Sequence, residues 1–287
     1  MSDSETTLAF TGERFTPECV REIWYEHWHR YAFAAGLVSG ARVLDLACGE
    51  GYGSDLLADH AAHVSGVDIS PEAVDHARRR YARDNLEFAV GSAADIPWDD
   101  ASFDRVVSFE TLEHLSQQRE MLAEFRRVLR PDGLLVISSP DRAVYSDQVG
   151  YQNEFHVREL YRDELMELLA EQFPAVRLLG QKLMFHSCIW SLDGPAGDAQ
   201  VMTLEDGQCQ SGPAPSAAPM YFIAICAARS ELLPSPPSLQ LFMDQAESVY
   251  QHYYHEIRKN MSAGEILQQR DREIEQLRQE LEQSKSR

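Results

Sequence analysis

Residues 42–54, with the sequence RVLDLACGEGYGS, constrain the fold of this chain more than any other stretch. Apolar residues typical of a buried strand lead into a turn with glycine at three alternate positions, and a helix-compatible segment follows. Glycine allows backbone conformations with positive φ and lets a ligand approach the main chain closely. A strand, a glycine-rich turn and a helix in this order form the opening unit of a nucleotide-binding α/β sheet. The three glycines are Gly49, Gly51 and Gly53.

The spacing of these glycines separates two kinds of ligand. A dinucleotide-binding turn has the pattern G-x-G-x-x-G, in which the middle glycine makes room for a pyrophosphate. This chain has G-x-G-x-G instead, and Asp45 closes the strand ahead of it. A carboxylate in that position repels a pyrophosphate and suits a cationic ligand. The spacing therefore disfavours a nicotinamide oxidoreductase, the alternative that a glycine-rich turn also suggests.

The first motif of class I S-adenosylmethionine-dependent methyltransferases resembles the segment from Asp45 to Gly53, D-x-A-C-G-x-G-x-G. The family usually has glycine where this chain has Ala47, which is a mild departure. The resemblance implies S-adenosyl-L-methionine as the cofactor. It also implies an α/β fold: a Rossmann-like, seven-stranded class I methyltransferase sheet with helices on both faces.

The rest of the chain fits that fold, because apolar strand patterns alternate with helical ones, as in a parallel sheet with right-handed crossovers. A later segment is predicted to be an antiparallel strand in a hairpin at the sheet edge. The predicted strands are 42–47, 63–68, 86–90, 103–109, 134–138, 176–179 with an extension over 182–190, and 221–228; the predicted helices are 18–36, 70–84, 116–130 and 157–173.

Three regions are expected along the chain. Residues 1–40 form an N-terminal arm and a helix that closes over the cofactor. Residues 41–229 form the methyltransferase domain, with a flexible, Gly- and Pro-rich insert at 191–219, and residues 230–287 form a linker and a C-terminal helix. Residues 140–156 are polar and aromatic and are expected to form a lid.

The C-terminal helix carries a short heptad pattern. Apolar residues recur every seven positions, with one more at the intervening core position, which is typical of a short coiled coil. A homo-oligomer or a protein partner bound through these heptads is therefore predicted; a lone solvated helix is the alternative. The residues are Leu267, Ile274, Leu277 and Leu281.

Composition narrows the partners. The chain has 46 acidic and 26 basic residues and a net charge of −20, which argues against a nucleic-acid substrate. Its five cysteines are scattered without a C-x-x-C pair, so neither a metal site nor a disulfide framework is predicted. Residues 1–5 are polar, unlike a signal peptide, and the longest apolar run, 221–228, is far too short for a transmembrane segment. A cytoplasmic location is expected.

Each part of S-adenosylmethionine has a candidate partner. Asp68, at the end of the second strand, can accept hydrogen bonds from both ribose hydroxyls, and Asp95 can accept one from the adenine amino group. The methionine end is expected over the glycine turn, with its ammonium near Asp45 or a carbonyl and its carboxylate on Arg30. Asp68 as a helix cap and Asp95 as a turn residue are the structural alternatives. The predicted set is Arg30, Asp45, Ala47, Gly49, Gly51, Asp68, Ile69, Ala94, Asp95, Ile96 and Glu110.

The methyl acceptor is expected at the carboxyl ends of the strands, where ligands of open α/β sheets bind. Polar residues follow the fourth strand (Glu110, Glu113, His114) and the fifth (residues 153–156), and histidines 27 and 29 of the first helix are weaker candidates. Methyl transfer to a hydroxyl needs a base for its proton. His156 is the predicted base, with His114 or Glu110 as the orienting group; a capping or packing role is the alternative for both histidines.

A narrower resemblance involves five segments: GERFTPE (12–18), EHWHRY (26–31), SFETLEH (108–114), YSD (145–147) and NEFHV (153–157). These resemble methyltransferase domains of bacterial surface-polysaccharide gene clusters, including the WbdD-like domain that caps polymannose O-antigen chains. The likeness covers residues 10–190 and implies Phe15, Thr16 and Arg30 as cofactor contacts.

Some members of that family fuse the domain to a kinase, but no kinase motif occurs here, so direct O-methylation of a sugar hydroxyl on a surface glycan or glycoconjugate is the prediction. Two alternatives stay open. One is a methyltransferase for a small molecule or nucleotide sugar of secondary metabolism, and the other is an inactive scaffold that acts through its C-terminal helix.

Overall fold

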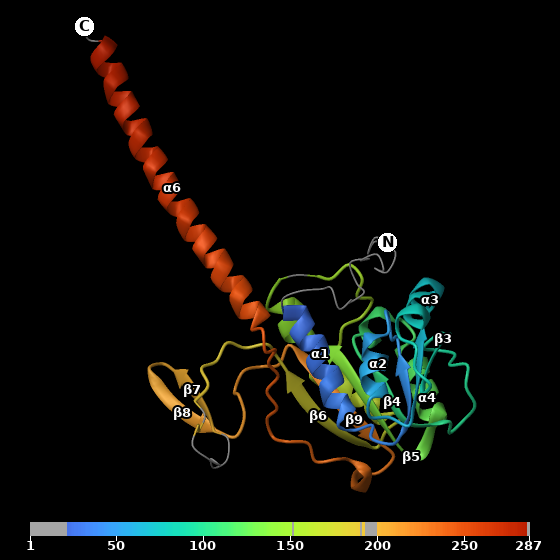
Figure 1. Ribbon diagram of the computed structural model, residues 1–287. Helices are drawn as coiled ribbons and strands as arrows, with labels where there is room; N and C mark the ends of the chain where they lie inside the picture. The colour runs from blue at the N-terminus through green and yellow to red at the C-terminus, as the bar shows by residue number, and fades with distance from the viewer. Residues whose placement is uncertain (1–21, 151, 190, 193–199, 286–287) are drawn as a thin grey trace. The chain divides into compact units, whose positions relative to one another are not determined.

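The computed structural model describes residues 22–150, 152–189, 191–192 and 200–285. Its centre is a seven-stranded sheet in the order β3-β2-β1-β4-β5-β9-β6 (Figure 1), which confirms the predicted Rossmann-like fold. The first five strands are parallel to one another; helices connect β1 to β2, β2 to β3 and β4 to β5, whereas a loop over residues 91–102 connects β3 to β4. They are β1 (Arg42–Leu46), β2 (His63–Asp68), β3 (Leu86–Val90), β4 (Phe103–Ser108) and β5 (Leu129–Pro140).

The last strand in the sequence of this sheet lies inside it. β9 (Tyr221–Ala227) is antiparallel, as predicted, but it pairs with β5 on one side and with β6 (Ala175–Gln181) on the other. The sheet edge is therefore β6 and not the strand at 221–228, and all seven residues of β9 are buried. Residues 182–189 form no strand, so the predicted extension of β6 is wrong.

Helices cover both faces of the sheet, and each face has its own apolar core. One core is formed with α1 (Glu22–Ala35), α2 (Tyr52–Ala58) and α3 (Pro71–Arg80). The other is formed with α4 (Gln118–Val128) and α5 (Arg162–Ala170). Several helices are shorter than predicted. For example, α4 begins two residues after Ser116, and a 3₁₀ turn over residues 112–114 precedes this helix.

The insert at 191–219 contains a hairpin. β7 (Val201–Glu205) pairs antiparallel with β8 (Gln208–Gly212), so the loop prediction is wrong for this part. Asp206 and Gly207 join the two strands, and both have positive φ. Asp-Gly is a strong two-residue hairpin signal because both positions need that backbone conformation. The Asp206-Gly207 pair is therefore a hairpin signal that is visible in the sequence.

The chain divides into two compact units. The sheet-containing unit extends to Leu241, beyond residue 229, because Leu232 and Leu233 pack against its core and Arg177 of β6 donates to the Pro234 carbonyl. The other unit contains α6 (Ser248–Lys285), a 38-residue helix that confirms the helical prediction. The heptad residues of α6 are 48–64% exposed, and their self-association stays a prediction. Among the described helices, none has the length and apolarity needed to cross a bilayer.

Candidate functional site

The glycine turn after β1 combines positive φ with close packing. Ala47, Gly49 and Gly51 have φ of 60°, 56° and 96°. A Cβ on Gly51 would lie 2.8 Å from Ala77 Cβ, and one on Gly53 would lie 2.1 Å from the Tyr31 ring. Gly53 therefore serves the packing of α1 against α2. Ala47 holds a left-handed conformation that costs an L-residue about 1–2 kcal/mol, which explains why glycine suits this position.

Asp45 is fully buried beneath this turn. The Ser54 hydroxyl donates to its Oδ2 at 2.6 Å, and the Tyr31 hydroxyl donates to its Oδ1 at 3.1 Å. Burial raises the pKa of Asp45 from its ordinary value of 3.8 to about 6, and these hydrogen bonds oppose the rise. Since Asp45 has no exposed surface, it can influence a bound cation only through its charge and not through direct contact.

The raised pKa of Asp45 predicts a pH effect on stability. Between the unfolded pKa and the folded one, the folded state binds more protons, so the free energy of unfolding falls as pH rises. A shift to about 6 lowers it by about 2 kcal/mol between pH 4.5 and 7. Asp45→Asn removes this contribution, so the variant should gain about 2 kcal/mol relative to wild type over that interval. Urea unfolding of both proteins at both pH values measures it; a pH-independent difference would contradict the pKa shift.

Glu50, inside the glycine turn, is a residue that sequence reasoning missed. Its side chain is fully buried and pairs with Arg80 at 2.8 Å, while the Tyr81 hydroxyl donates to it at 2.9 Å. The backbone N–H of Tyr52 donates to its Oε2 at 3.1 Å. Glu50 thus connects the turn to the end of α3. Position 50 is an unremarkable x in the motif, so only the fold reveals its partners.

Asp68 lies at the carboxyl end of β2, beside the glycine turn. Its Oδ2 accepts a hydrogen bond from the Gly49 N–H and its Oδ1 accepts one from the Ser70 N–H, both at 2.9 Å. A carboxylate has about four acceptor sites, so two donors leave room for two hydroxyls. Asp68 is not the cap of the next helix, because Ser70 is the N-cap of α3 and Asp68 binds only the Ser70 N–H ahead of that helix. Next to Asp68, the Ile69 side chain is 73% exposed, an apolar surface that a flat ring could cover.

The predicted adenine contacts after β3 differ from one another. Asp95 is exposed, and its N–H donates to the Ser92 carbonyl at 3.2 Å, as in a turn. Ala94 is partly exposed. Ile96 is only 2% exposed and packs in the core formed with α4 and α5. Its side chain therefore does not face solvent, and only its backbone could flank a ring.

Arg30 and Glu110 form a buried ion pair between α1 and the end of β4. Nη1 of Arg30 lies 3.3 Å from Glu110 Oε1 and donates to Gln181 Oε1 at 3.1 Å. The guanidinium stacks over the Tyr221 ring at 4.7 Å. Burial lowers the pKa of Arg30, but the charge of Glu110 together with Tyr221, Glu26 and Tyr52 more than offsets it, so the pKa is raised. Ser138 of β5 donates to Glu110 Oε1 at 2.6 Å.

Glu110 therefore neutralises the cation that was predicted to bind the methionine carboxylate. Arg30 is 1% exposed, and its Nε has no hydrogen-bond partner among the described residues. Glu110 itself has φ of 49°, a strained conformation of the kind that gathers at functional sites. The structure brings Arg30 and Glu110 together, and their contact with a cofactor stays a prediction.

The polar residues after β4 and β5 converge, as the topology predicted. The His114 and His156 rings lie 4.9 Å apart, and the Tyr145 ring stacks on His156 at 5.3 Å. Two hydrogen bonds from the N–H groups of residues 157 and 158 to the Glu113 carbonyl join the two segments. Gln118, also missed from sequence, donates to the carbonyls of residues 112 and 158. We call Glu113, His114, His156 and Glu159 the acceptor-side cluster.

Both histidines of the acceptor-side cluster are oriented by hydrogen bonds. Nδ1 of His156 lies 2.6 Å from Glu159 Oε1, and Nδ1 of His114 lies 3.1 Å from the Phe155 carbonyl. A carbonyl or carboxylate partner assigns the proton to Nδ1 in each ring and leaves Nε2 as the basic nitrogen. Burial, with the Glu110 charge, raises the pKa of Glu113 well above its usual value. One potential ligand atom from each of Glu113, His114 and His156 lies within 4.8 Å of the others.

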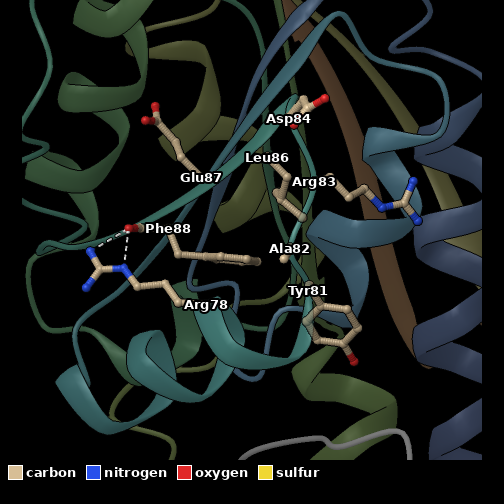
Figure 2. Close-up of a pocket in the computed structure, with 8 residues that line it drawn as sticks. All are labelled: Arg78, Tyr81, Ala82, Arg83, Asp84, Leu86, Glu87 and Phe88. Carbon is tan, nitrogen blue, oxygen red and sulfur yellow. Dashed lines mark hydrogen bonds between the residues drawn. The ribbon is translucent and has the colours of Figure 1, made fainter.

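A cavity of about 450 Å³ lies elsewhere, beside α3 and the amino end of β3 (Figure 2). Two nitrogens of Arg78 donate to the Phe88 carbonyl there at 3.0 and 2.7 Å, as Figure 2 shows, and Arg83 pairs with Asp55 and Asp59. These charged groups are occupied with one another. The cavity is at the opposite end of the strands from Asp68 and Glu110, so we do not assign the site to it.

Some predicted residues cannot be placed. Phe15 and Thr16 lie outside the described residues, so their predicted cofactor contacts stay untested.

His27 and His29 of α1 are partly buried, and burial with the Arg30 charge lowers the pKa of His27 well below its usual value. A histidine that resists protonation in this way is a poor proton carrier near neutral pH.

Comparison with known proteins gives consistent matches. Residues 44–137 match the family model described as a methyltransferase domain. A probable S-adenosylmethionine-dependent methyltransferase of Mycolicibacterium smegmatis is 41% identical over 57% of this chain and 64% of its own length, so the chain spans less than two thirds of that relative. One of Mycobacterium tuberculosis is 39% identical over 69% of this chain and 74% of its own. The crystal structure of the YcgJ protein from Bacillus subtilis, 22% identical, superposes with a TM-score of 0.51 over 69% of this chain and 97% of that one, which concerns the fold alone.

Proposed function

Because this chain belongs to the family of S-adenosylmethionine-dependent methyltransferases, we propose that it methylates a sugar hydroxyl of a bacterial surface glycan or glycoconjugate. S-adenosyl-L-methionine is its cofactor, and it supplies an activated methyl group on a sulfonium sulfur. The observation that carries the proposal is the acceptor-side cluster, which follows β4 and β5 at the same ends of the strands as Asp68.

The cofactor side fits the chemistry of that molecule. Asp68 retains acceptor capacity for ribose hydroxyls beyond its two backbone donors. Ile69 offers an exposed apolar face beside it, and the positive φ of Gly49 keeps the turn open to close approach. Asp45 adds a buried negative charge below the turn, which favours a cationic ligand over a pyrophosphate.

The acceptor-side cluster fits oxygen as the methylated atom. Transfer to a hydroxyl is an in-line displacement in which the oxygen must lose its proton. Glu159 holds Nδ1 of His156, so Nε2 is the nitrogen that can take the proton; it lies 3.1 Å from the Asn153 amide. His114 and Glu110 are the predicted orienting groups. The half-buried Tyr145 ring, 5.3 Å from that of His156, adds an aromatic surface that the C–H face of a sugar could contact.

The acceptor is tested directly by incubating the protein with labelled cofactor and separate panels of glycans, nucleotide sugars and small hydroxylated metabolites, followed by mass spectrometry. A labelled glycan supports the proposal. Label confined to the small molecules favours secondary metabolism, the first alternative. Binding of S-adenosylhomocysteine without transfer to any panel favours the scaffold alternative.

Asp68→Asn should weaken binding of S-adenosylhomocysteine by about 1–3 kcal/mol, because the carboxylate becomes an amide with a single acceptor oxygen. Isothermal titration calorimetry measures the affinity. Asp75→Asn, an exposed change on α3, is the matched control and should bind as wild type does. Equal affinity for Asp68→Asn and wild type would remove Asp68 from the cofactor site.

Two further parts of the proposal concern the surroundings of the enzyme. A cytoplasmic location is supported by the four described cysteines, which are all free thiols. Assembly through α6, either with a second copy or with a protein partner, is supported by its exposed heptad residues.

A further inference from the structure

Glu113 is a buried carboxylate that the proposed reaction does not use. It is 1% exposed, and neither of its side-chain oxygens has a hydrogen-bond partner within the described residues. A buried polar group without a partner typically costs about 1–3 kcal/mol, and more when it is charged. Such a group in a folded protein calls for an explanation, and binding of a cation is one of the few that physical chemistry offers.

The two imidazoles beside Glu113 are arranged as metal ligands are. Metal-binding histidines usually donate the other ring N–H to a carboxylate or a backbone carbonyl, which fixes the tautomer and the orientation of the ring. His156 has Glu159 in that role and His114 has the Phe155 carbonyl. A carboxylate oxygen and one nitrogen from each ring lie within 4.8 Å of one another.

We propose that Glu113, His114 and His156 bind a divalent transition-metal cation. Two imidazoles and one carboxylate with open positions form the ligand set of many Fe²⁺ and Zn²⁺ sites, and imidazole disfavours Ca²⁺ and Mg²⁺. Ligand bonds of about 2.0–2.2 Å require these atoms to draw together slightly. The cation would replace the Asn153 amide, which lies 3.1 Å from Nε2 of His156.

The consequence for catalysis rests on the proposed function. An acceptor hydroxyl bound to the open positions of the cation would have a lowered pKa and would lose its proton more readily. His156 would then hold the cation and act on the proton only through it. This assignment also gives Glu113 a role, since its charge would be neutralised by the ion.

Titration of the full-length, chelator-treated protein with Co²⁺ tests the site without any turnover. We expect one equivalent to bind with the visible absorption of a protein-held Co²⁺, and we expect Zn²⁺ to displace it. Glu113→Gln should weaken binding at least about 100-fold, because even groups that only orient ligands are worth about 10–100-fold. Glu171→Gln, an exposed carboxylate on the far end of α5, is the matched control and should bind as wild type does.

Glu159→Gln guards against a folding artefact, because it keeps all three ligands and changes only the group that orients His156. It should weaken Co²⁺ binding by about 10–100-fold. Absence of Co²⁺ binding by the wild type, or equal binding by Glu113→Gln and Glu171→Gln, would overturn the proposal. Glycan methylation that persists in chelator without Co²⁺ binding would sink the metal site and leave the proposed function standing. Co²⁺ binding without methylation of any glycan would contradict the proposed function and leave the metal site standing.

Discussion

His156→Ala is expected to reduce the rate of methyl transfer by roughly 10²–10⁴-fold, the usual contribution of a group that handles a proton in the transition state. Binding of S-adenosylhomocysteine should be unchanged, because His156 belongs to the acceptor-side cluster and not to the glycine turn. The side chain is 6% exposed and paired with Glu159, so the loss cannot be attributed to a mobile surface group. Single-turnover kinetics with labelled cofactor measure the rate.

His60→Ala is the matched control for this experiment. His60 is exposed, in the turn after α2 at the other end of the sheet, and its removal should leave the rate as it is. Wild-type turnover by His156→Ala would remove His156 from the reaction altogether. If wild-type protein keeps its normal rate in chelator, His156 acts as a direct base. If chelator abolishes that rate and Co²⁺ restores it, His156 acts as a metal ligand.

The parallel strands of the sheet were predictable because each depends on local signals that repeat along the chain. Each parallel strand is a short apolar run, and residues 42–54 indicate the first connection in the series of alternating strands and helices. The position of β9 in the sheet was harder to predict, because a wholly apolar run such as Tyr221–Ala227 indicates that a strand is buried but not which strands it pairs with. Only the pairing of β9 with both β5 and β6 shows that it lies within the sheet.

The sequence predicted where the candidate site lies, but it did not predict which residues form hydrogen bonds and ion pairs there. The ends of β2 and β4 predicted that Asp68 and Glu110 lie at the same edge of the sheet, since parallel strands bring their carboxyl ends to one edge; their contacts with a cofactor stay a prediction. The partners of these residues come from distant positions that carry no motif. Gln181, which binds Arg30 across 151 residues, and Glu50, which binds Arg80, were both invisible until the fold placed them.

The convergence of Glu113, His114 and His156 was not predictable for a related reason. The scattered cysteines gave no indication of a metal site, and the donors that converge are a carboxylate and two imidazoles. Glu113 and His114 are adjacent in sequence, whereas His156 comes from the segment after β5. Hydrogen bonds to the Glu113 carbonyl bring that segment back. Ligand sets divided in this way have no sequence spacing to recognise.

Arg30→Met should lower the free energy of unfolding by about 3–5 kcal/mol, since removal of one member of a buried ion pair leaves the other charge without compensation. Arg30 is 1% exposed, and its removal would leave Glu110 and the Gln181 amide without their cation. Urea unfolding at pH 7 measures the change. Arg119→Met breaks the exposed pair with Glu171 and should leave the free energy of unfolding close to that of wild type, which makes it the matched control.

The double variant Arg30→Met/Glu110→Gln separates a structural role from a ligand-binding one. If the cost of Arg30→Met comes from the uncompensated Glu110 charge, the double variant should recover about half of it or more, because the second change removes that charge. Arg30→Met with wild-type stability and weakened S-adenosylhomocysteine binding would instead assign the guanidinium to the methionine carboxylate. Alternatively, Arg30→Met could lose stability that Glu110→Gln restores, while cofactor affinity is retained. That outcome would assign Arg30 a structural role in joining α1 to β4, because its charge would then be satisfied within the protein.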